Sequence, residues 1–186
     1  KDLERYLLLI DDLPGVTVES VLVPSKNEPG ASELILTLKH KKYGANGGVD
    51  NRGSKFNGPV QFKAGANANS ALGLYEKLGI MGIITSQPDE LFYFNGFGEF
   101  AVSTEGTKLS VSTSISKSEP GSSLKVYQVE GDSSTFSLGL SHPFIRSRKE
   151  NLRGHLNFTS RNSETELLGA TLSKDHLRVI NLGMSY

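Results

Sequence analysis

The sequence feature that most constrains the fold is a strictly alternating run in the second half of the chain. Within residues 135–142, Phe136, Leu138 and Leu140 alternate with small or polar residues. Successive side chains of a β-strand point to opposite faces, so this run predicts a strand with one apolar face and one small, polar face. Pro143 follows, and because proline has no amide proton to donate, we expect it to end the strand.

Most of the chain after residue 42 repeats this alternation in strand-length runs separated by turn residues. One face of each run is mainly apolar, whereas the other carries Gln, Lys, Asn, Glu, Arg and Ser. Residues 118–134 are mostly polar and are predicted to lie outside the strands. About eight strands are expected, over residues 43–49, 59–69, 75–85, 91–103, 107–117, 135–142, 151–161 and 177–186.

The first 42 residues have a different pattern. Residues 2–13 place apolar side chains three and four apart, which predicts a helix that Pro14 and Gly15 terminate. The paired acids at its end, Asp11 and Asp12, are predicted to be solvated charges. Two further strands are expected at 16–24 and 32–42, joined by a turn at 25–31 that contains Pro29 and Gly30. A unit of this size is too small to bury a core alone, so we expect it to be the end of a longer domain.

Composition excludes several classes of function. Cationic and anionic residues balance at 20 each, which gives no argument for nucleic acid binding. The chain has no cysteine, and its four histidines do not have the spacing of metal ligands. No catalytic constellation is recognisable, so the chain is predicted not to be an enzyme and to have no cofactor or metal site. An apolar run of roughly 18 residues is lacking, but a transmembrane strand needs only about 10 alternating residues.

Two β architectures fit the pattern. In a soluble sandwich or barrel the polar face is the outer surface, whereas in a membrane barrel the apolar face meets lipid and the polar face lines the lumen. On pattern alone the soluble fold is favoured, because soluble β folds are commoner. Aromatic residues near the predicted strand ends fit an interfacial girdle but are too few to decide: Tyr43, Tyr75, Phe92, Tyr93 and Tyr186.

Residues 131–148, GDSSTFSLGLSHPFIRSR, resemble the mid-barrel signature of the two-partner secretion transporters. These outer-membrane proteins secrete and activate haemolysins and filamentous haemagglutinins. Residues 7–16 resemble the last helix and turn of the family's second POTRA domain, and residues 30–35 its closing strand. Residues 46–55 resemble the first barrel strand and turn, and residues 175–179 a later strand. The resemblance spans nearly the whole chain in the expected order.

The resemblance implies a mainly β protein with an antiparallel transmembrane barrel. Residues 1–42 would be the C-terminal part of a POTRA domain, with an α-β-β order. Residues 43–186 would be the N-terminal half of the barrel, with about eight of the family's sixteen strands. The chain has no match to the family's Val-Arg-Gly-Tyr loop motif. Half a barrel has two unpaired edges, so we expect it to pair with another copy, to close on itself or to fold differently. The implied location is the bacterial outer membrane, with the N-terminal part in the periplasm.

The implied function is that of a translocation pore component that secretes a large unfolded adhesin or haemolysin, in contact with outer-membrane lipid. The alternatives are a barrel-assembly insertase of the same superfamily and a soluble β-sandwich binding module. The predicted POTRA strands would bind the partner by strand addition, or would pack their apolar residues in their own core: Val18, Val21, Ile35 and Leu36. The candidates for lining the lumen are Lys63, Asn67, Glu99, Lys108, Arg153, His155 and Arg178.

Overall fold

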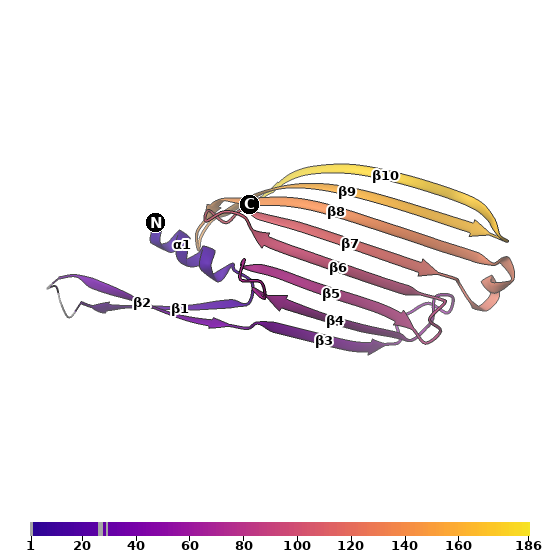
Figure 1. Ribbon diagram of the computed structural model, residues 1–186, viewed down its shortest axis with the longest axis horizontal. Helices are drawn as coiled ribbons and strands as arrows, with labels where there is room; N and C mark the ends of the chain where they lie inside the picture. Colours follow the sequence, from indigo (N-terminus) through magenta and orange to yellow (C-terminus); the bar gives the residue numbers. More distant parts are fainter. Residues whose placement is uncertain (1, 26–27, 29) are drawn as a thin grey trace.

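The computed structural model describes residues 2–25, 28 and 30–186. Figure 1 shows a long curved sheet, with one helix at its end and a two-stranded ribbon extending away from it. The elements in chain order are α1 (Asp2–Asp11), β1 (Val16–Pro24), β2 (Ser32–His40), β3 (Tyr43–Asp50), β4 (Gln61–Asn69), β5 (Glu76–Thr85), β6 (Phe92–Ala101), β7 (Lys108–Ser118), the 3₁₀ helix η1 (Ser122–Tyr127), β8 (Val129–Arg146), β9 (Asn151–Leu167) and β10 (Ala170–Ser185).

The large sheet is a simple meander of eight strands in the order β10-β9-β8-β7-β6-β5-β4-β3. Each strand pairs antiparallel with the next one along the chain. This confirms the predicted mainly antiparallel β fold with eight strands after residue 42. The sheet is not closed, because β3 and β10 each have one neighbour among the described residues. It is a single layer, and no second sheet among these residues packs on it as a sandwich would require.

The strand register gives this sheet two distinct faces. Directly paired residues lie on the same face, and one row across β7–β10 reads Leu109, Leu140, Leu156 and Leu182. The adjacent row on the opposite face reads Lys108, Ser141, His155 and Gly183. We call the first the apolar face and the second the polar face. The apolar face is exposed in the described chain, with Phe136, Leu138 and Leu140 between 41% and 44% accessible.

The prediction that Pro143 ends its strand is wrong. Strand β8 continues to Arg146, and the ladder contains a register shift between Pro143 and Ile145. A β-bulge tolerates proline because the local ladder is already interrupted there. The pairing of β8 with β9 therefore resumes on the far side of the proline, and Arg146 is still paired with Asn151.

The predicted polar segment 118–134 is also different in the structure. Its middle forms η1 (Ser122–Tyr127), and its last residues, from Val129, belong to β8. Strands β9 and β10 likewise extend beyond the predicted ranges because a two-residue hairpin joins them. Leu168 and Gly169 have φ values of 53° and 74°, as a type I′ turn requires at both central positions. The polar residues beside this turn therefore continue the ladder rather than form loops.

The N-terminal unit consists of α1 and the hairpin of β1 and β2. The hairpin register runs from Val16 opposite His40 to Pro24 opposite Ser32. The turn predicted at 25–31 lies partly outside the described residues, because Lys26, Asn27 and Pro29 are not among them. Apolar side chains are exposed on both faces of the hairpin, including Val21, Leu22, Ile35, Leu36 and Leu38. Exposed apolar surface of this kind is typical of a contact with further polypeptide.

Helix α1 packs against the end of the large sheet through a close approach at Gly106. The side chain of Leu9 is 8% exposed. A Cβ atom added to Gly106 would lie 2.5 Å from Leu9 Cδ2 and 2.9 Å from Pro143 Cγ. Gly106 also has a φ of 86°, in the left-handed region that favours glycine. The turn before β7 therefore requires glycine both for its backbone conformation and for the docking of the helix.

We expect Gly106→Ala to loosen α1 from the sheet. The left-handed backbone alone costs an alanine about 1–2 kcal/mol, and the clash with Leu9 adds to this. Amide exchange in α1 should therefore become faster in detergent-solubilised protein. Gly169→Ala is the matched control, because Gly169 has a φ of 74° and no heavy atom within 4 Å of an added Cβ. Equal acceleration in both variants would contradict the contact proposed for Leu9.

Candidate functional site

The polar face of β7 and β8 is a wall of small hydroxyl side chains. Ser112 on β7 is paired with Ser137 on β8, and Ser137 is paired with Thr159 on β9. Small hydroxyl groups remain hydrated and present little apolar area. The same face of these two strands also carries Ser110, Ser114, Ser116, Ser133, Thr135, Gly139 and Ser141.

Two ion pairs also lie on the polar face of the sheet, and one of them involves β7. Lys63 on β4 lies 2.7 Å from Asp50 on β3. Lys108 on β7 lies 2.8 Å from Glu99 on β6, and its Nζ also donates to the carbonyl oxygen of Asp12, at 3.0 Å. The second lysine therefore contacts the residue that follows α1, where a cation is favoured by the carbonyl groups at a helix C-terminus.

The register places six of the seven predicted lumen residues on the polar face: Lys63, Asn67, Glu99, Lys108, Arg153 and His155. The Asn67 amide donates to the Asn69 side chain at 3.2 Å. The ring of His155 lies over Gly183, where a Cβ would meet Nε2. That these residues line a lumen remains a prediction, but they do lie on one surface.

Arg178 does not lie with the other six. It is paired with Ser160, and its side chain therefore lies on the apolar face with Ile180 and Leu182. The sequence analysis placed Arg178 among the lumen candidates, but positions an even number apart on a strand lie on the same face, so Arg178 shares the face of Ile180. Arg178 donates to Asn162 Oδ1 at 3.0 Å, beyond the end of the apolar band.

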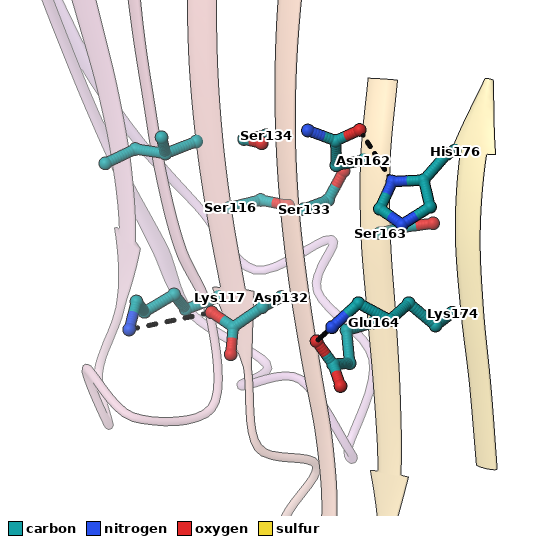
Figure 2. A pocket seen from close by; sticks show the side chains of 11 residues that line it. Ser116, Lys117, Asp132, Ser133, Ser134, Asn162, Ser163, Glu164, Lys174 and His176 are labelled. Atoms are coloured by element: carbon teal, nitrogen blue, oxygen red, sulfur yellow. Dashed lines mark hydrogen bonds and ion pairs between the residues drawn. The ribbon is translucent and has the colours of Figure 1, made fainter. Parts of the chain in front are cut away.

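A strip of polar residues marks that end of the apolar band on β7–β10 (Figure 2). Lys174 lies 2.9 Å from Glu164, and His176 Nδ1 lies 2.9 Å from Asn162 Oδ1. A third pair, Lys117 and Asp132, joins β7 to β8. The three pairs border a shallow depression of about 270 Å³. Exposed ion pairs of this kind contribute little to stability. The strip therefore limits the height of the apolar band rather than holding the sheet together.

The four predicted strand-addition residues do not form one surface. Val18 and Leu36 lie on one face of the β1–β2 hairpin, and Val21 and Ile35 lie on the other. Val18 is half-buried beside α1, and its amide donates to Asp11 at 3.1 Å. The other three side chains are exposed, so in the described chain they do not pack in a core of their own.

The connection between α1 and the large sheet was not predicted from the sequence. Asp12 accepts two hydrogen bonds from Arg146, from Nε at 2.7 Å and from Nη2 at 2.8 Å. The two side chains are 24% and 19% exposed, so Asp12 is not the solvated charge that was predicted. Arg5 also bonds Glu105, at 3.2 Å. The only sequence signal was a group of basic residues within 146–149, at the end of β8 and just after it, which does not identify an acidic partner.

The polar face also carries an apolar patch that the alternation did not indicate. Ile83 and Tyr93 are directly paired, and Met81 on β5 lies on the same face. Phe97 on β6 lies over Gly79, where a Cβ would meet the ring. Strands β5 and β6 are therefore less hydrophilic on this face than β7 and β8.

The described residues include no cluster of three or more His, Cys, Asp and Glu side chains suited to a metal ion. No described helix is long and apolar enough to cross a membrane.

The sequence model of "Haemolysin secretion/activation protein ShlB/FhaC/HecB" matches residues 30–186. The chain belongs to this family. Haemolysin secretion/activation proteins are secretion transporters rather than enzymes, and they lie in the bacterial outer membrane with their N-terminal part in the periplasm. The resemblance inferred from residues 131–148 is therefore confirmed.

Individual relatives agree with this haemolysin secretion/activation family. The heme/hemopexin transporter protein HuxB of Haemophilus influenzae strain 86-028NP is 26% identical over 175 residues, 93% of this chain. CdiB from Escherichia coli has a similar fold, with a TM-score of 0.78 at 22% identity, over 96% of this chain and 34% of that one. BamA from Haemophilus ducreyi, lacking POTRA domains 1–3, also has a similar fold. Its TM-score is 0.56 at 16% identity, over 98% of this chain and 36% of that one. The chain spans about 30% of the length of HuxB.

Proposed function

We propose that this chain forms part of an outer-membrane pore that secretes a large unfolded protein, an adhesin or a haemolysin. The observation that carries the proposal is the division of one eight-stranded sheet into an exposed apolar face and a hydroxyl-rich polar face. The apolar face suits lipid, and the polar face suits a hydrated passage. Membership of the secretion family supports this assignment of the two faces.

We further propose that residues 1–42 form the C-terminal part of a POTRA domain and residues 43–186 the N-terminal half of the barrel. The change from the two-stranded to the eight-stranded sheet at Lys41 and Lys42 supports this boundary. Strand β2 has one neighbour, β1, among the described residues. Its free edge offers backbone groups to an extended cargo segment, and backbone pairing is tolerant of sequence.

Deleting the gene for the protein in its host tests the secretion function. We expect one or a few large proteins to disappear from the cell surface and medium, and to return when the gene is restored. Proteomics of the medium and of the outer membrane measures both. Unchanged surface and medium proteins would contradict the proposal.

The second candidate is a barrel-assembly insertase, which the fold similarity to BamA supports. An insertase predicts the opposite pattern in the same experiment, with depleted porins in the outer membrane and a general loss of barrel proteins. The two functions are therefore distinguished by which class of protein is lost.

A further inference from the structure

Between α1 and the polar face lies a recess of about 420 Å³. Its apolar lining includes Tyr6, Leu9 and Ile10 from the helix. Lys108 and Arg153 from β7 and β9 border it on the polar face. The volume is within the range of roughly 300–1,000 Å³ that is typical of ligand pockets. The recess is therefore an apolar concavity bordered by two cationic side chains and by Asp12.

Arg153 is the unpaired charge of this recess. Among the described residues its guanidinium makes no hydrogen bond or ion pair, and its side chain is exposed. The nearby acids are already engaged, since Asp12 accepts from Arg146 and Glu99 accepts from Lys108. Arg153 thus provides a positive charge with free donors at the border of the apolar lining.

We propose that this recess is a receiving site for the cargo, which binds an extended segment carrying an acidic side chain next to aliphatic or aromatic ones. The acid pairs with Arg153, and the apolar side chains contact the lining at Leu9 and Ile10. Charge complementarity selects this occupant, because a carboxylate satisfies the free guanidinium in a planar, two-point geometry. The inference rests on the proposed secretion function, since the occupant is the unfolded protein that is moved.

The position of the recess fits this role. It lies where the N-terminal unit meets the polar face, at the end of the sheet from which α1 and the β1–β2 ribbon extend (Figure 1). In this proposal, a segment released from the edge of β2 meets this end of the sheet first and the hydroxyl wall of β7 and β8 afterwards. Binding there would be weak and local, as repeated release requires during translocation.

Binding of two labelled peptides to the detergent-solubilised chain tests the site. The probes are a 12-residue peptide of alternating Leu and Ser with one central Glu, and the same peptide with Gln in its place. Fluorescence anisotropy should show tighter binding of the Glu peptide. We expect Arg153→Gln to weaken binding of the Glu peptide about tenfold, to remove the preference for Glu, and to leave the Gln peptide unchanged. Arg153→Lys should restore part of the preference.

Arg161→Gln is the matched control. Arg161 lies on the same strand and face as Arg153, eight positions away, and donates to Ser133 Oγ at 3.2 Å. The Arg161→Gln variant should bind both peptides as the unsubstituted chain does. Equal losses of Glu-peptide binding in the two variants would indicate general attraction by positive charge and would overturn the site. The site would also be overturned if the Glu peptide bound Arg153→Gln as tightly as the unsubstituted chain, or if it did not bind the unsubstituted chain at all.

Measuring secretion in the host distinguishes failure of the receiving site from failure of the proposed secretion function. We expect cells that carry Arg153→Gln to secrete less than cells that carry Arg161→Gln, at equal amounts of folded protein. Normal secretion with Arg153→Gln, when deletion of the gene stops secretion, would overturn the receiving site and leave the transporter intact. If deletion itself has no effect on secretion, the proposed function is wrong.

Discussion

Leu138→Arg is expected to prevent stable insertion of the sheet into a bilayer. Leu138 lies between Phe136 and Leu140 on the apolar face, and it is paired with Val111 and Phe158. An arginine on the lipid face costs about 2–4 kcal/mol near the bilayer midplane. Refolding of the chain into phosphatidylcholine liposomes, measured as the protease-protected fraction, should fall to a small part of that of the unsubstituted protein.

The neighbouring residue provides the control for this experiment. Ser137→Arg introduces the same side chain one position away, on the polar face opposite Ser112 and Thr159. Its insertion should be close to that of the unsubstituted chain, because a charge on the hydrated face keeps its solvent. Equal insertion of the two variants, or a greater loss for Ser137→Arg, would show that the apolar face does not meet lipid.

Arg146→Gln is expected to release α1 from the sheet. Its guanidinium donates two hydrogen bonds to Asp12, and both side chains are mostly buried. Charge-assisted hydrogen bonds of this kind contribute about 1.5–3 kcal/mol each, and removing one partner leaves the other charge unsatisfied. Hydrogen–deuterium exchange should therefore become much faster in α1, with little change in the centres of β7–β9.

A double-mutant cycle isolates the pair. Asp12→Asn should resemble Arg146→Gln, and the double variant should be little worse than either single variant if the two residues act through each other. Lys39→Gln is a suitable control, because the Lys39–Glu19 ion pair on the hairpin is more than half exposed. If the effects of the two substitutions on amide exchange were fully additive, the docking of α1 would depend on other contacts, such as that of Leu9 against Gly106.

The contact between Asp12 and Arg146 was not predicted from the sequence. Asp12 and Arg146 are 134 residues apart, and their local sequence shows only an acidic pair after a helix and a basic cluster after a strand. Arg178 was misplaced for a different reason. Near the end of the apolar band, polar residues occur on both faces, so the polarity of a side chain no longer indicates its direction.

The ends of the strands were also not predicted correctly from the sequence. Pro143 and the polar residues before Thr135 suggested breaks, but a bulge carries β8 past the proline, and the residues from Val129 onward pair with β9. In both places the neighbouring strand supplies the pairing, so the preference of a single residue is overridden.

By itself the sequence determined that the second part of the chain consists of about eight strands, each with one apolar and one polar face. It could do so because alternation with a period of two is a local property of each strand. Only the tertiary structure decided how α1 is anchored at Asp12 and Arg146, and which side chains border the recess at Arg153. Those contacts depend on the register of β7–β9 and on the docking of the helix, and both are set by interactions between residues far apart in the chain.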